Sequence, residues 1–284
     1  MNEVVLSALV NSLAIPFAVA AGAALIGRYA GLTASGLALA LGVLAGHLGG
    51  HVAVSHWPSV PPEGAVDKLL WMGLVGAGLG VLLDRVADAR RRQIILAVAV
   101  GLGILWIGWA RLSDLEGQAV LAGVLILGFV VWTLDRLETT DRGGGVVLAV
   151  IIVAATAGVG LYASSYKMAM LIATLAAAIA GAAAAAGSAP AGFGRAAQLA
   201  VAGPATGLLT MLGLYTLAEP LALILLAVIP LTTSLVAWIE GQLAAAGRGK
   251  AGPALHMAIQ GGLALLPAAA AVGVAYAAGG PLYA

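Results

Sequence analysis

The chain has 284 residues, of which 62% are hydrophobic and only 9% are charged, and its mean hydropathy of +1.07 excludes an ordinary soluble domain. The formal net charge of +1 comes from scattered residues, which excludes the basic surface of a nucleic-acid-binding protein. The chain has no cysteine, so disulfides, thiolate metal ligands and a cysteine nucleophile are excluded as well.

Ten continuous apolar runs are long enough to cross a hydrocarbon core, which takes about 20 helical residues. They lack the alternation of barrel strands, so they predict an all-α integral membrane protein: a polytopic helical bundle surrounded by the lipid bilayer. We expect one transmembrane domain over residues 1–284, no soluble domain and an uncleaved first run. The predicted spans are Val4–Ile26, Thr33–Ser55, Leu69–Leu83, Ile94–Ala110, Ala119–Leu134, Val146–Ala163, Met168–Gly187, Leu199–Ala218, Leu221–Ile239 and Ala254–Ala278.

The positive charges support this count, because lysine and arginine concentrate on the cytoplasmic side of membrane proteins. Ten spans place three cations on one side, Lys68, Arg111 and Lys167. They place ten on the other side: Arg28, Arg85, Arg90, Arg91, Arg92, Arg136, Arg142, Arg195, Arg248 and Lys250. Both termini then lie on the outer side. Losing two spans preserves the later parity, so an eight-span chain is the structural alternative.

Small residues recur at helical spacing in the second and third spans. Gly42, Gly46 and Gly50 follow one another every four residues in the second span, and Gly76 and Gly80 do so in the third. Lipid gives apolar helices no reason to associate, so membrane helices pack closely where side chains are small. We therefore expect these two spans to pack tightly against each other.

Prolines interrupt several spans. A proline removes one backbone donor and frees a carbonyl, so a break can present polar groups to a cavity. Transporters use broken helices of this kind, although kinked spans without a transport role are common. The prolines concerned are Pro16, Pro204, Pro230 and Pro267.

Three of the four histidines fall in the stretch AGHLGGHVAVSHW, Ala45–Trp57. On a helix that starts near Thr33 at the inner side, His47 lies roughly 21 Å and His51 roughly 27 Å along the axis. These two are four residues apart on one face, the spacing at which two imidazoles can hold one ion. His56 is half a revolution out of phase, so it joins them only if the helix ends before it.

The candidate ligands for zinc or copper are His47, His51 and His56. Glu63 or Asp67, from the loop that follows, could complete the site. The main alternative is structural, with neutral imidazoles hydrogen-bonding between helices. A proton-linked switch is also open, whereas haem fits less well because histidines on one helix face cannot sandwich an iron. His256 lies near the inner end of the last span, too far away to join.

The sequence contains no HExxH, GxSxG or Walker motif, which favours a role without catalysis or nucleotide hydrolysis. Ten spans, several of them interrupted by proline, and short loops favour a permease for a small-molecule substrate. The histidines favour a metal-binding membrane enzyme or redox subunit instead. The scarcity of polar residues in the spans favours a structural or assembly subunit of a larger complex, with partner chains or further copies of itself. The compact loops suggest a bacterial inner membrane.

Overall fold

The computed structural model describes residues 3–32, 36–140, 143–163, 165–186, 193–246 and 252–279. The residues that the sequence analysis named and that lie outside these ranges are Thr33, Arg142, Gly187, Arg248 and Lys250. The elements in chain order are α1 (Glu3–Leu9), η1 (Val10–Ala14), α2 (Ile15–Tyr29), α3 (Leu37–Val54), α4 (Ala65–Leu83), α5 (Ala89–Leu112), α6 (Gly117–Thr139), α7 (Gly144–Tyr162), α8 (Tyr166–Ala186), α9 (Arg195–Tyr215), α10 (Pro220–Val228), η3 (Ile229–Leu231), α11 (Thr232–Ala245) and α12 (Pro253–Gly279).

Ten helices in the described part of the chain are long and apolar enough to cross a membrane. This confirms the ten predicted spans, and the eight-span alternative is wrong. Several helices extend beyond the predicted apolar runs because charged residues continue the helix. The span predicted from Ile94 begins at Ala89, where the Asp88 carboxylate accepts hydrogen bonds from the backbone N–H groups of Arg90 (2.8 Å) and Arg91 (3.3 Å).

Two of the four predicted proline breaks interrupt their spans. The first span runs through α1, the π-helix η1 and α2, and Pro16 is the second residue of α2. Proline has no N–H to donate to the preceding turn, and the local winding is wider there. The ninth span changes to a 3-10 turn at Pro230. In contrast, Pro204 and Pro267 lie within continuous α9 and α12, so no break follows from those prolines.

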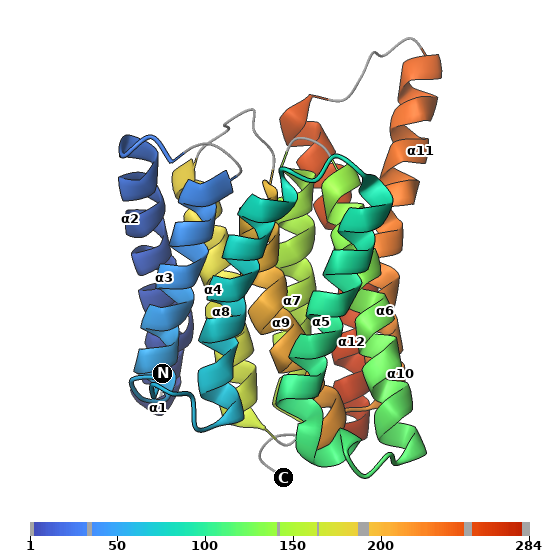
Figure 1. The fold of residues 1–284 in the computed structure, drawn as a ribbon. Coiled ribbons are helices and arrows are strands. Elements are labelled where there is room, and N and C mark those ends of the chain that lie inside the picture. The colour runs from blue at the N-terminus through green and yellow to red at the C-terminus, as the bar shows by residue number, and fades with distance from the viewer. Residues whose placement is uncertain are drawn as a thin grey trace.

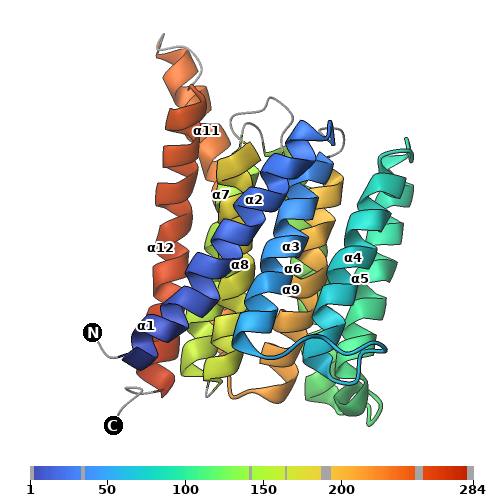
Figure 2. The ribbon, with the colours of Figure 1, turned by 90° about the vertical axis from the view of Figure 1, so that its left-hand side faces the viewer.

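The most buried spans are α7, α8 and α9, and they form the centre of the bundle. Helices α2 and α3 pack on α8, and α4 lies along α9 (Figures 1 and 2). On the other side, α12 packs against α7 and α10. Helix α3, which carries His47 and His51, therefore lies between the interrupted first span and the central helix α8.

The two glycine stripes pack against different helices, so the expected pairing of the second and third spans is wrong. A Cβ atom at Gly46 would lie 2.6 Å from the Pro16 carbonyl oxygen and 2.9 Å from Ala178 Cβ, so this stripe fits between α2 and α8. A Cβ atom at Gly76 would overlap with the Leu199 carbonyl oxygen of α9, and at Gly80 it would lie 2.6 Å from the Arg195 carbonyl oxygen. The glycines are needed where backbones touch.

The two ends of the bundle differ in charge. At the arginine-rich end, where α2, α4, α6, α8 and α11 end, Arg195 pairs with Asp84 at 3.0 Å and with Glu138. Arg92 lies 3.5 Å from the same Glu138 carboxylate. This network joins the ends of α4, α5, α6 and α9. We call the opposite end, which holds the connection between α3 and α4, the histidine end; α1 begins and α12 ends there (Figure 2).

We expect the two ends to lie on opposite sides of the membrane, with the arginine-rich end in the cytoplasm. A reporter inserted at Gly143, directly before α7, should then be cytoplasmic, and one fused after Ala284 should be outside. Compartment-specific reporters such as alkaline phosphatase and a fluorescent protein measure this. Cytoplasmic signals from both positions would contradict the orientation.

The glycine contacts predict a sharp difference between two positions on α4. Gly76→Ala should lower the free energy of unfolding by about 1–3 kcal/mol, because the added methyl group forces α4 and α9 apart. Beyond the backbone of its own helix, no atom of the described residues lies within 4 Å of the Gly78 Cβ position, so Gly78→Ala should be neutral or stabilising by up to about 1 kcal/mol through helix propensity. Thermal unfolding of the two purified variants in one detergent compares them, and equal midpoints would refute this packing.

Candidate functional site

The end of α3 places His56 closer to His51 than a continuous helix would. The helix ends at Val54, and Ser55 has φ −124° and ψ −98°, so the chain leaves the helical path before His56. The condition under which His56 could join the others is therefore met. The ring centroids of His51 and His56 are 6.1 Å apart, in an edge-on arrangement.

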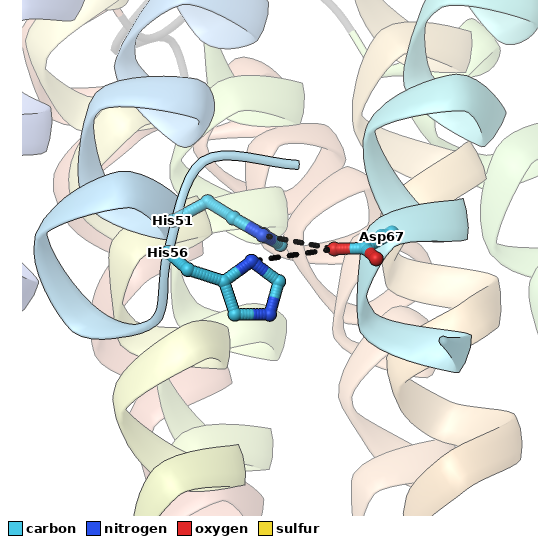
Figure 3. Close-up of side chains that lie close together, drawn as sticks. All are labelled: His51, His56 and Asp67. Atoms are coloured by element: carbon cyan, nitrogen blue, oxygen red, sulfur yellow. Dashed lines mark ion pairs between the residues drawn. The ribbon is translucent and has the colours of Figure 1, made fainter. Parts of the chain in front are cut away.

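His51 and His56 meet a carboxylate from the next helix. Asp67 lies in the first turn of α4, where the sequence analysis placed a loop. Its Oδ1 atom is 3.7 Å from His51 Nε2 and 3.9 Å from His56 Nδ1 (Figure 3). His51 is fully buried and Asp67 is 4% exposed, whereas the His56 side chain is 59% exposed. The three side chains form a cluster in which His51 and Asp67 are shielded from solvent and His56 is accessible to it.

The Asp67 carboxylate is held by the preceding connection. The Ser59 hydroxyl donates a hydrogen bond to Asp67 Oδ2 at 2.6 Å and accepts one from the Glu63 backbone N–H at 3.0 Å. Among the described residues Oδ1 accepts no hydrogen bond, so it remains directed at the two imidazoles. No signal in the sequence singled out Ser59; a serine in a proline-rich connection is typical of any turn.

His47 does not join this cluster and is paired across a helix interface. Its Nδ1 atom lies 3.2 Å from the Thr174 hydroxyl of α8. Thr174 donates its single hydroxyl proton to the Leu171 carbonyl oxygen at 2.7 Å, so it accepts from His47. His47 thus carries its proton on Nδ1, and its buried Nε2 atom has a free lone pair and no hydrogen-bond partner among the described residues.

Glycine packing creates the contact between His47 and Thr174. A Cβ atom at Gly50, one turn from His47, would lie 2.5 Å from Thr174 Cβ. The absence of a side chain at Gly50 therefore lets Thr174 approach α3 closely. Thr174 is among the few polar residues of α8. Its polarity within an apolar span is the only signal in the sequence that could have pointed to a hydrogen-bond partner for His47 on that helix.

The remaining candidates lie elsewhere. Glu63 is exposed, and its carboxylate is not part of the cluster. His256 lies on α12, where its Nδ1 atom is 2.8 Å from the Glu240 carboxylate of α11. Two of the four histidines, His51 and His56, thus form a cluster with Asp67 at the histidine end. His47 and His256 each lie elsewhere.

The structure also has a groove between α4, α5 and α9 with a volume of about 480 Å³. Val75 and Leu102 line it and are exposed, so it opens at the surface of the bundle. Its lining is apolar apart from Thr206 and Trp106. A groove of this composition suits hydrocarbon rather than a polar solute, so the histidine row along α3 is the candidate polar site.

Comparison with known proteins gives one informative similarity. The chain is 30% identical over 162 residues to the UPF0324 membrane protein RSc1111 of Ralstonia nicotianae, over 54% of this chain and 43% of that protein. The chain thus spans less than half of the length of this relative. It matches no protein-family profile and no solved structure. Together with the ten apolar helices, the relative identifies this chain as an all-α integral membrane protein.

The hydrogen bond between His47 and Thr174 can be tested through stability. Thr174→Val keeps the shape but leaves the His47 N–H unpaired, which should lower the free energy of unfolding by about 0.5–2 kcal/mol. Thr174→Ser retains the hydroxyl and should stay closer to the wild type. Thermal unfolding in detergent measures both, and a valine variant as stable as the wild type beside a destabilised serine variant would show that the methyl group, not the hydroxyl, stabilises the contact.

Proposed function

We propose that this protein is a permease that moves a small polar solute across the membrane. The observation that carries the proposal is the row of imidazoles on α3, His51 and His47, whose unpartnered nitrogen atoms lie in the interior of the bundle beside an interrupted span. His47 lies seven residues before the end of α3, about 10 Å from the histidine end.

Unpaired nitrogen atoms are costly in this environment. Both nitrogens of His51 and Nε2 of His47 are buried without a hydrogen-bond partner among the described residues. Each such atom in a membrane interior costs several kcal/mol unless water or a solute pairs with it. An apolar side chain would fill the space without that cost, so the histidines favour a path that water or solute enters. Ionisable residues within spans commonly mark such pathways.

The interruption of the first span lies next to this row. The π-helix η1 contacts both α3 and α8, and Pro16, two residues after η1 ends, lies against the Gly46 and Gly50 positions that flank His47. π-helical turns often occur at functional sites, and transporters build their substrate sites from discontinuous spans. A break at this place can move the first span relative to α3 without unwinding either helix.

We further propose a bacterial inner membrane as the location, with the histidine end and both termini outside. The distribution of cations supports this orientation, since the described cations at the histidine end are Lys68, Arg111 and Lys167, against seven at the other end. The seven are Arg28, Arg85, Arg90, Arg91, Arg92, Arg136 and Arg195. The permease would then accept solute at His56 and His51 and pass it inward along α3.

The test uses the absence of native cysteine, so that each variant carries one thiol. Thr174 is fully buried in this state, and a permease must expose it when it opens. Thr174→Cys in intact cells should therefore react slowly with a membrane-impermeant thiol reagent. Leu175→Cys, at the next residue and equally buried, faces the packed core and should not react.

The same variants connect the pathway to transport. Proteoliposomes are offered labelled inorganic anions, amino acids and monosaccharides, and uptake above protein-free vesicles identifies the solute class. Thiol modification of Thr174→Cys should slow that uptake, and modification of Leu175→Cys should not. If the thiol of the Thr174→Cys variant never reacts and no solute enters, the histidines are structural and the permease proposal is wrong. Stoichiometric co-purification of other membrane proteins would then support the role of an assembly subunit.

A further inference from the structure

We infer that His51, His56 and Asp67 form a binding site for one divalent transition-metal ion, with zinc as the reference ion. The site lies at the histidine end, between the end of α3 and the first turn of α4 (Figure 3). The inference concerns binding and not transport. It shares His51 and His56 with the proposed solute pathway, but a zinc titration tests it without any transport measurement. It also differs from the pair His47 and His51 that helical spacing suggested.

The distances fit a site that closes slightly around an ion. One ligand atom from each residue lies within 4.8 Å of the other two, and the two distances to Asp67 Oδ1 are 3.7 and 3.9 Å. Tetrahedral zinc with bonds of about 2.1 Å needs ligand atoms about 3.4 Å apart. Movements of less than about 1 Å per side chain therefore suffice. His56, exposed and outside the helix, is free to make them.

The buried atoms of the cluster lack other partners. His51 Nδ1, His51 Nε2 and Asp67 Oδ1 are buried and make no hydrogen bond among the described residues. The separation of 3.7 Å between His51 and Asp67 is too long for a hydrogen bond between them. A buried carboxylate oxygen beside an unpaired imidazole is costly, and a cation between them satisfies both groups at once.

The surroundings of the cluster support metal ligation. The hydrogen bond from Ser59 to Asp67 Oδ2 orients the carboxylate, as hydrogen-bonding partners commonly do for carboxylates that bind metals. His56 Nδ1 donates to the Trp57 carbonyl oxygen at 2.9 Å. To bind the ion, the exposed ring gives up this hydrogen bond and carries its proton on Nε2, which leaves the Nδ1 lone pair for the ion. Three protein ligands leave one tetrahedral position for water, on the side where His56 is open to solvent.

The donor set selects the class of ion. Two imidazole nitrogens and one carboxylate oxygen suit zinc and neighbouring divalent transition metals. Magnesium and calcium prefer sites made of oxygen ligands, so they should bind weakly here. A bound ion would join the connection after α3 to α4 and so stabilise the histidine end of the bundle.

The test titrates the metal-free, purified full-length protein in detergent with zinc against a chromophoric chelator. The wild type should bind one zinc ion per chain, and zinc should raise its unfolding midpoint. His56→Gln and Asp67→Asn should each weaken zinc binding by at least about tenfold and abolish the rise. His56 is exposed, so its variant folds even if Asp67→Asn does not.

Two matched controls separate this site from its competitors. Glu63→Gln removes a carboxylate from the same connection, and His47→Gln removes a histidine from the same helix; both should retain wild-type zinc affinity. The inference is overturned if the wild type binds no zinc, if His56→Gln binds it as tightly as the wild type, or if magnesium competes at equal concentration. If His47→Gln loses as much zinc affinity as His56→Gln does, His47 and His51 would instead be ligands, as their helical spacing suggested.

Discussion

Close contact between helix backbones at glycine is the constraint on which the rest of this structure depends. Lipid competes equally well for apolar side chains, so the spans associate only where their backbones can touch. Gly46 brings α3 against α2 and α8, and Gly76 brings α4 against α9. These contacts determine which helices are neighbours, and they therefore also determine which polar side chains can meet.

The histidines show how packing creates chemistry in an apolar interior. Because Gly50 has no side chain, Thr174 comes close enough to accept a hydrogen bond from His47. One turn further along α3, the end of the helix and the start of α4 bring His51 to Asp67. On the same helix, His47 thus has one of its two ring nitrogens hydrogen-bonded to a neighbouring span. His51 faces a carboxylate without a hydrogen bond between them.

The two proposals assign different tasks to these neighbouring groups. The permease proposal concerns the row of His51 and His47 along α3, which lies beside an interrupted span. The metal proposal concerns the cluster at the histidine end, where His56 is open to solvent. Both arise from nitrogen atoms that remain unpaired in a low-dielectric environment, which is expensive unless water, a solute or an ion occupies the site.

The sequence by itself determined the class of protein, the ten spans and their alternating direction, and it drew attention to the histidines between His47 and His56. These features follow from hydropathy, helical rise and loop charge, which are local properties of the chain. Only the tertiary structure decided that the glycine stripes pack on α2, α8 and α9, and that Asp67 rather than His47 completes the cluster. Periodicity gives the face on which a side chain lies, but its partner depends on which helix comes close, and that depends on the fit of all ten spans together.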